Sequence, residues 1–592
     1  MKDFLKYTLA TLTGIILFML VVGIICVFSL IGMAASDTAT VNVKDNSVFT
    51  LKLSGIVQER SSDDMGMLAL LSNNEFGSMG LDDILASIEK AKENEAIKGI
   101  YIEAGPAEYD SYATAQTIRD ALADFKKSGK WIVAYGDEFT QMNYWVASVA
   151  NELYMNKTGM LDLKGLGRKA EYHTGLYEKL GIKYQAVRVG KYKSYVEMNT
   201  RKDMSPEDRE QRMAYMQGAW NRMLKDIAES RKLKPEGLNQ LVNDSIMAFA
   251  NPEDYLKAKL IDKMLYPDEL KQLMKKKLGL ADDEDVSQAL LTDMINVKST
   301  KKNDGEQVAV YYAVGEITDE DLSSFTGESG IVGKTMTEDL GKLAADEDVK
   351  AVVIRVNSPG GSAFASEQIW HEIQLLRAEK PVVVSMGGMA ASGGYYISCG
   401  ANEIWAEPMT LTGSIGIFGM IPDASELLTD KLGLSFDVVK TNALSDFGAM
   451  GRPFNATETA LLQGHINRGY ELFTGRVAGG RGLEQDSVKV IAEGRVWTGE
   501  QAQKIGLVDK LGNLDDAIAS AAKLAELEDY TVGSYPAPEP WYMGLLDKSA
   551  DDYMQGKIRA ALGEFYPAVS LVRRIGKMDP VQARLPFDPN IK

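Results

Sequence analysis

The sequence predicts an α/β protein in which two tandem domains of the same type follow an N-terminal transmembrane helix. Three observations support this fold class: strand-like runs alternate with helical patterns, long stretches recur in the second half of the chain, and an uncharged run lies near the N-terminus. A chain of 592 residues is also too long for one hydrophobic core.

The α/β prediction comes from the order of the patterns. Apolar runs such as "AVVIRV" (351–356) and "PVVVSM" (381–386) are typical of buried strands, and "ASEQIWHEIQLLRAEK" (365–380) between them has helical spacing. The first half repeats this order with "IYIEA" (100–104) and "WIVAYG" (131–136). Such alternation favours a largely parallel sheet covered by helices.

The duplication is visible in paired segments. "NEAIKGIYIEAGP" (94–106) resembles "DEDVKAVVIRVNSP" (346–359), and residues 136–159 resemble residues 387–413, at an offset of about 252 residues. "LGIKYQAVRVGKYKS" (180–194) and "LGLSFDVVKTNALSD" (432–446) share a strand-like alternation. A repeat of this length indicates a duplicated domain rather than a solenoid.

The N-terminal run has no charged residue from Thr8 to Ala35, and Lys2 and Lys6 precede it. As a helix it could cross a hydrocarbon core of about 30 Å. The run is longer than the apolar region of a cleaved signal peptide, so we expect a signal-anchor with the remaining chain outside the cytoplasm.

These features divide the chain into five predicted parts. They are a transmembrane helix (8–35), a first domain with a helical extension (47–280), a linker (281–306), a second domain (307–535) and a C-terminal tail (536–592).

Composition excludes several classes of function. The net charge of −18 argues against nucleic acid as a partner. Two cysteines form no visible disulfide framework, and three histidines leave little room for an imidazole metal site. We therefore expect no metal and no cofactor.

The two copies differ where chemistry is expected. In the second copy a strand ends in "NSPGGS" (357–362), where glycines at a strand-to-helix turn can expose N–H groups to an oxyanion. The first copy has Tyr109 at about the place of Gly361. Alignment also puts Gln141 opposite Ser392, and Ser445 opposite Lys193. The first copy lacks the glycine turn and the serine, and the second copy lacks the lysine. This complementary loss favours one site composed of residues from both copies.

The motifs "RVNSPGG", "ASGGYYIS" and "LTGSIGIFG" of the second copy, with "VGKYKSYVE" of the first, resemble the long, duplicated form of the signal peptide peptidase A (protease IV) family. The resemblance covers most of the chain. It implies a Clp/crotonase-like fold, a homotetramer and a Ser–Lys dyad. It further implies the roles of five residues: nucleophile Ser392, general base Lys193, lysine-supporting Ser414, and oxyanion-hole Gly361 and Gly393.

Other readings remain open at this point. Ser392 could be only a small residue in a tight turn, and Lys191 or one of three histidines (His173, His371, His465) could be the base. A crotonase-like acyl-CoA enzyme could use the same glycine turn, and a duplicated membrane scaffold would need no chemistry.

The expected function is that of a serine endopeptidase in the inner (cytoplasmic) membrane, with its domains on the extracytoplasmic, periplasmic side. It would cleave remnant signal peptides and similar apolar peptides through an acyl-enzyme. A serine hydroxyl needs a base, and a lysine serves as one only when burial lowers its pKa.

Overall fold

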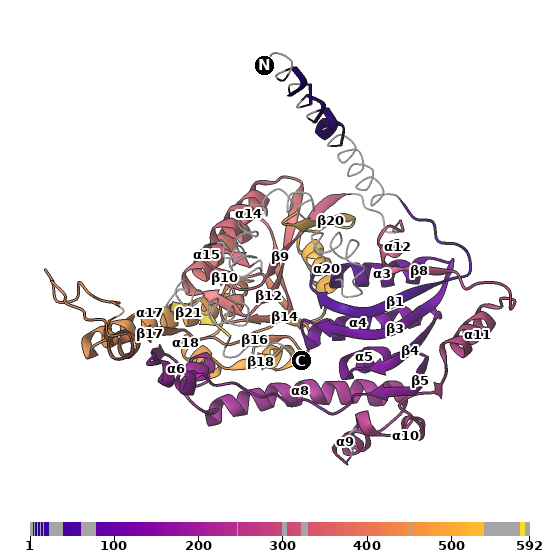
Figure 1. Cartoon of the computed structure of the whole chain (residues 1–592), viewed down its shortest axis with the longest axis horizontal. Helices are drawn as coiled ribbons and strands as arrows, with labels where there is room; N and C mark the ends of the chain where they lie inside the picture. Colours follow the sequence, from indigo (N-terminus) through magenta and orange to yellow (C-terminus); the bar gives the residue numbers. More distant parts are fainter. Residues whose placement is uncertain are drawn as a thin grey trace.

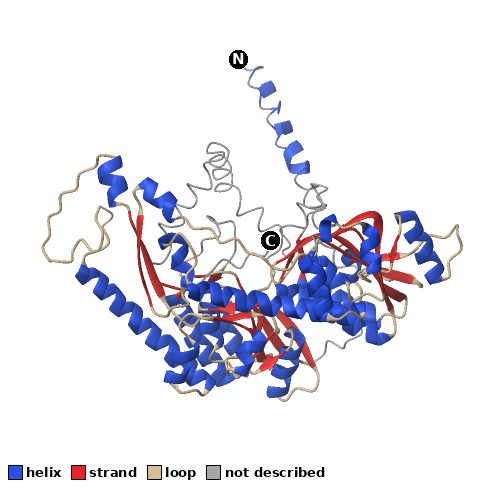
Figure 2. Cartoon of the chain, turned by 90° about the horizontal axis from the view of Figure 1, so that it is seen from below, coloured by secondary structure: helices blue, strands red, loops and turns tan. Residues whose placement is uncertain are grey.

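In this computed structural model the described residues are 40–60, 78–244, 247–298, 305–320, 330–449, 451–537 and 581–585, with parts of 4–22. The described chain forms two α/β halves that lie side by side, with helices flanking the strands (Figures 1 and 2).

The first half contains a parallel sheet in the order β2-β1-β3-β4-β5-β7, with β8 also paired to β1. Its central strands are buried because helices cover both faces, as parallel sheets require. The strands are β1 (Ser47–Gln58), β2 (Ser78–Gly80), β3 (Ile97–Tyr109), β4 (Trp131–Phe139), β5 (Glu152–Leu161), β7 (Lys263–Met264) and β8 (Gln288–Leu290).

The helices of the first half include a long one, α8, which lies beneath both halves in Figure 1. Ser205 caps α8 by accepting a hydrogen bond from the backbone N–H of Asp208. The helices are α3 (Leu81–Glu93), α4 (Tyr112–Phe125), α5 (Gln141–Ala147), α6 (Thr174–Leu180), α7 (Glu197–Thr200), α8 (Pro206–Arg231), α9 (Pro235–Asp244), α10 (Pro252–Lys257), α11 (Pro267–Leu278) and α12 (Leu291–Ile295).

The second half contains a sheet in the order β18-β16-β14-β12-β9-β20, extended by β15 and β19. All residues of β14, and all residues of β12 except Lys350, are buried, because their continuous apolar runs form the centre of this largely parallel sheet. The strands are β9 (Glu306–Val314), β12 (Val349–Ser358), β14 (Val382–Ala391), β15 (Glu403–Ala406), β16 (Leu411–Gly413), β18 (Val496–Thr498), β19 (Lys510–Leu511) and β20 (Tyr530–Tyr535).

The helices of the second half recur at the spacing of the predicted repeat. Thus α8 and α17 each contain 26 residues, and α3, α4 and α5 correspond to α14, α15 and α16. The helices are α14 (Gly333–Ala345), α15 (Ala363–Glu379), α16 (Gly393–Ser398), α17 (Ala456–Arg481), α18 (Gln485–Ile491), α19 (Gly499–Lys504) and α20 (Leu514–Leu524).

A third sheet crosses the boundary between the halves in the order β11-β10-β13-β21-β17-β6. The first-copy strand β6 pairs antiparallel with second-copy β17, from Arg188 opposite Phe418 to Lys183 opposite Asp423. The strands are β6 (Lys183–Arg188), β10 (Ile317–Thr318), β11 (Ile331–Val332), β13 (Gly360–Ser362), β17 (Phe418–Asp423) and β21 (Val581–Arg584).

Three predicted segments differ from simple expectation. Residues 432–446, which alternate like a strand, form no strand and are exposed except for Asp446, whereas the matching β6 has β17 as a partner. The predicted linker (281–306) contains β8 and α12, and the predicted tail (536–592) contains β21.

The predicted transmembrane helix (8–35) is only partly described, because residues 23–35 lie outside the described residues. Among residues that are described, no helix is both long and apolar enough to cross a membrane.

A buried ion pair joins the two halves next to the ends of β1 and β12. Arg355 donates to the Glu59 carboxylate at 2.9 Å and 3.1 Å, and to Ser385 Oγ at 2.9 Å. Both charged side chains are 2% exposed. Nearby, Asn357 donates to Asp110 at 2.8 Å, and burial raises the pKa of that carboxyl to about 7. Removing one member of a buried pair leaves the other charge uncompensated.

Glu59→Gln should therefore destabilise the fold by about 3 kcal/mol, because Arg355 would lose its counter-charge. The matched change Glu103→Gln removes a half-exposed partner of Lys52 at 3.8 Å and should cost less than about 1 kcal/mol. Urea unfolding of both variants measures the difference. Equal effects would contradict the importance of the buried pair.

Candidate active site

Ser392 stands at the turn between β14 and α16. It is fully buried and adopts φ 57° and ψ −112°, a conformation that non-glycine residues rarely occupy. Its N–H donates to Gly413 O at 2.8 Å, and its carbonyl accepts from the N–H of Tyr396 at 2.8 Å. Both backbone groups are thus fixed, and strain of this kind clusters at functional sites.

Lys193 approaches Ser392 from the first copy. Its Nζ lies 2.7 Å from Ser392 Oγ, 2.9 Å from Ser414 O and 3.0 Å from Ser414 Oγ. The side chain is fully buried, and burial holds its pKa well below the usual value. These hydrogen-bond partners are uncharged oxygens, so they offer an ammonium ion little compensation for lost water.

Glycines of the second copy make room for this lysine. A Cβ on Gly494, which has φ 78°, would lie 2.7 Å from Lys193 N, and one on Gly416 would lie 3.5 Å from Lys193 Cδ. The backbone of Tyr192 donates to Glu493 O at 3.0 Å. The lysine loop therefore lies directly against second-copy backbone, with no side chain between them.

Polar contacts within the first copy hold the same loop. Arg188 donates to Lys193 O at 3.0 Å, and Gln211 of α8 donates to Tyr192 O at 2.9 Å. Ser194 Oγ donates to Asp208 at 2.5 Å, next to the cap of α8. These bonds fix the backbone on both sides of Lys193, so the position of its side chain does not depend on Ser392 alone.

Of the two glycines expected in an oxyanion hole, Gly393 directly follows Ser392, and Gly361 lies on β13, whose Gly360 packs against Gly393. Gly393 begins α16, and a Cβ built on Gly360 would lie 2.7 Å from its backbone nitrogen. Gly361 pairs with Ile317 of β10, and a Cβ there would lie 1.9 Å from Ile317 O. A side chain at either β13 glycine would displace backbone, which explains the glycine pair.

The alternative bases lie elsewhere. Lys191 is exposed and ion-paired with Glu493 at 3.3 Å. His371 and His465 are exposed on helices, and His173 contacts Glu171 at 3.3 Å. Of the candidate bases, Lys193 is therefore the one that the structure brings to Ser392.

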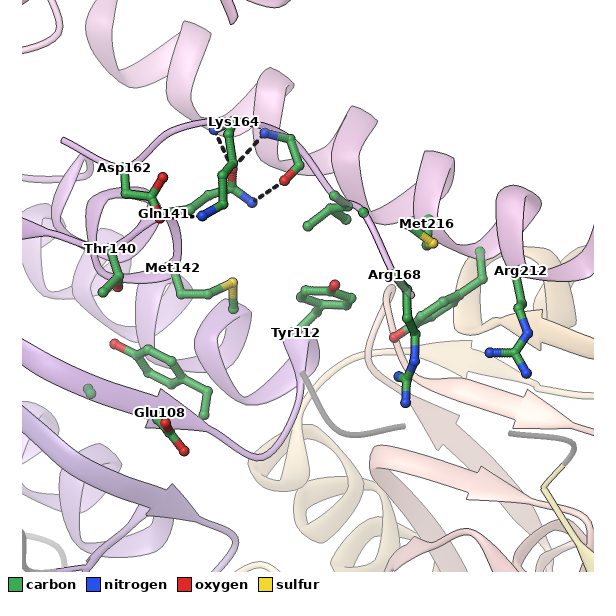
Figure 3. Close-up of a pocket in the computed structure, with 16 residues that line it drawn as sticks. Glu108, Tyr112, Thr140, Gln141, Met142, Asp162, Lys164, Arg168, Arg212 and Met216 are labelled. Carbon is green, nitrogen blue, oxygen red and sulfur yellow. Dashed lines mark hydrogen bonds and ion pairs between the residues drawn. The ribbon is translucent and has the colours of Figure 1, made fainter. Parts of the chain in front are cut away.

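The first copy has a pocket of about 580 Å³ at the equivalent place (Figure 3). We identify the equivalent places from Tyr144 and Tyr395, which align between the two copies. The Tyr144 hydroxyl donates to Leu260 O and the Tyr395 hydroxyl donates to Leu507 O, each at 2.8 Å. Gln141 replaces Ser392 and accepts hydrogen bonds from Lys164 N and Gly165 N, as the dashed lines show. Tyr109 stands at about the position that Gly361 has in the second copy. With Gln141 in place of the serine, this pocket has no nucleophile at that position. In the second copy Ser445, which aligns with Lys193, is exposed.

Sequence reasoning missed Gly494, the α8 contacts and β21. Gly494 stands in "AEGRVW", which contains no motif, so only the fold reveals its contact with Lys193. The tail did carry a signal: Val581, Ala583 and Leu585 alternate with polar residues, as in a half-buried strand.

Ser392→Gly should be more stable than Ser392→Ala by about 1 kcal/mol, because glycine relieves the backbone strain that alanine retains. Both variants lose the same hydroxyl. At Ser398, which lies within α16, the same two changes should give the reverse order. Denaturant unfolding of the four variants tests this. An alanine variant at least as stable as the glycine variant at position 392 would show that the turn is unstrained.

Two protein-family models match parts of the chain. A family model described as peptidase family S49 matches residues 124–281 and again residues 374–528, and a Clp protease model matches residues 329–408. The repeated match of the S49 model confirms the duplication. The match of the Clp protease model supports a Clp-like segment in the second half.

Curated relatives match most of the chain. Protease 4 of Salmonella typhi is 34% identical, over 90% of this chain and 86% of its own. The chloroplastic serine protease SPPA of Arabidopsis thaliana is 30% identical, over 82% and 70%. Protease 4 of Haemophilus influenzae is 33% identical, over 75% and 72%. The resemblance seen in the motifs is confirmed: the chain belongs to peptidase family S49 and is a serine protease.

Proposed function

We propose that the protein cleaves peptide bonds with a Ser–Lys dyad, in which Ser392 is the nucleophile and Lys193 the general base. The observation that carries this proposal is the 2.7 Å contact between Lys193 Nζ and Ser392 Oγ inside the protein. Membership of a peptidase family leaves the acyl-CoA and scaffold alternatives without support.

The surroundings of Lys193 suit a neutral amine. A neutral amine has two N–H donors and one lone pair. When the two donors are directed to Ser414 O and Ser414 Oγ, the lone pair is left for the Ser392 hydroxyl. Burial lowers the lysine pKa and thereby favours the form that can accept a proton. Ser414 would act as the positioning residue for the base.

The reaction would proceed through an acyl-enzyme. Ser392 Oγ attacks the carbonyl carbon, Lys193 takes its proton, and the departing amine receives that proton. Water then releases the acyl group with Lys193 again as base. The N–H groups of Gly361 and Gly393 would stabilise the oxyanion, because glycine permits the close approach that a Cβ would block.

The substrates, assembly and location belong to the same proposal. Remnant signal peptides and other apolar peptides are favoured because a relative in Enterococcus faecium, 34% identical over 250 residues, is named a putative signal peptide peptidase. The uncharged 8–35 run supports anchoring in the inner membrane, with the domains on the periplasmic side. The family resemblance supports assembly as a homotetramer.

Ser392→Ala and Lys193→Met should each lower kcat/KM for a peptide substrate by at least about 1,000-fold, because nucleophile and base act as a unit. The double variant should lose little more than either single one. Peptide turnover and fluorophosphonate labelling of Ser392 provide the measurement, with Lys191→Met as the matched control that retains activity. Normal turnover by Lys193→Met would refute the dyad.

A further inference from the structure

The cavity of about 580 Å³ in Figure 3, here named the first-copy pocket, has kept its space although it has no serine. Gln141 stands at the serine position. It accepts from Lys164 N at 3.0 Å and from Gly165 N at 2.9 Å, and it donates to Gly165 O at 3.3 Å. The amide group of Gln141 is therefore tied to the wall of the pocket.

Tyr109, at about the glycine position, is held in a similar way. Its hydroxyl donates to Asn143 Oδ1 at 2.7 Å, and Asn143 in turn donates to Gly105 O. Tyr109 and Asn143 are both buried. The residues that replace the catalytic ones thus belong to hydrogen-bond networks around an open cavity, and loss of the nucleophile has not closed the cleft.

Apolar side chains from several elements line the first-copy pocket. In Figure 3 the side chains of Met142 of α5 and Tyr112 of α4 point toward each other. Leu166 and, from α8, Tyr215 and Met216 complete this apolar lining. Methionine and aromatic side chains adapt to apolar ligands of different shape, and a mostly apolar cavity of about 300–1,000 Å³ is typical of a binding site.

The charges around the first-copy pocket largely compensate one another. Lys164 pairs with Asp162 at 2.7 Å, and Arg212 pairs with Asp208 at 2.8 Å. The two other charged residues of the lining have opposite signs. This balance favours an uncharged, apolar ligand over an ion.

The first-copy pocket also adjoins the surroundings of Ser392. Tyr215 lines the pocket and packs against an apolar cluster that contains Ala391, the residue before Ser392. Ser111, which caps α4, lies so close to Gly388 of β14 that a Cβ on Gly388 would have no room. The path from Ser392 to the pocket therefore passes Tyr215, along surfaces that belong to both copies.

We propose that the first-copy pocket binds an apolar side chain of the same peptide that Ser392 cleaves, at a place several residues away from the scissile bond. This inference rests on the proposed dyad. The duplicated cleft has then changed from a second catalytic site into a second binding site for the substrate. Because an extended peptide spans about 3.3 Å per residue, a long apolar peptide occupies both places and a short one occupies only the place at Ser392. The pocket thereby selects long apolar peptides.

Turnover of two peptides with the same scissile bond tests the proposal. One has about 5 residues, and the other has about 15 because an apolar stretch is added. Met216→Lys puts a charge into the first-copy pocket and should lower the ratio of kcat/KM for the long peptide to that for the short one at least about tenfold. The control Met213→Lys changes another methionine of α8 that is 58% exposed, and it should leave this ratio as in wild type.

Cross-linking locates the bound peptide without relying on turnover or on a pocket variant. The full chain with Ser392→Ala receives the long peptide, which carries a benzophenone group in its apolar stretch. Mass spectrometry should find the cross-link at Met142 or Met216. An excess of the unmodified long peptide should suppress this cross-link, and the same excess of the short peptide should not.

Two results would overturn the proposal, and they differ. In the first, Ser392 is labelled and both peptides are hydrolysed, but the cross-link lies only in the second copy or Met216→Lys keeps the wild-type ratio. The first-copy pocket is then no part of the substrate site, as when a second copy of the chain covers it, and the proposed dyad stands. In the second, neither labelling nor hydrolysis of either peptide occurs, so the proposed function fails and the binding site fails with it.

Discussion

The site depends on a lysine that is buried without a counter-charge. Lys193 is fully enclosed, and its amine contacts the hydroxyl of Ser392 together with two oxygens of Ser414. An ammonium ion in this place would lose its water and gain only dipoles, so the neutral amine is favoured. Because the enclosure comes from second-copy backbone at Gly416 and Gly494, the basicity of a first-copy residue is set by the other half of the chain.

Duplication makes this division possible. The first copy has exchanged the serine and glycine positions for Gln141 and Tyr109, and the second copy has an exposed serine where the lysine would be. Three contacts join the two halves around the site. They are the β6–β17 ladder, the buried Glu59–Arg355 ion pair and the backbone hydrogen bond from Tyr192 to Glu493. A shift at this boundary would move Lys193 relative to Ser392 and would therefore alter the proposed chemistry directly.

Local pattern was enough to predict the alternating strands and helices and the repeat. These features follow from periodicity and from comparison of one half with the other. The same comparison made Ser392 and Lys193 candidates, but the choice of Lys193 over Lys191 came from the family resemblance. The pattern failed where a partner strand decides the outcome: residues 180–194 and 432–446 alternate alike, but only the first contains a strand, because β17 lies beside it. Likewise, the alternation at 581–585 acquires meaning only between β13 and β17.

The central claim is that Lys193 is a neutral base, and the pH dependence of Ser392 labelling by a fluorophosphonate tests it most directly. If proton removal by Lys193 limits the rate, labelling should rise with pH as the amine loses its proton and then level off. The lowered pKa puts the midpoint well below 10.5. Lys193→Met should label slowly and without that transition. A wild-type midpoint at or above 10.5, or the same transition in Lys193→Met, would contradict the account.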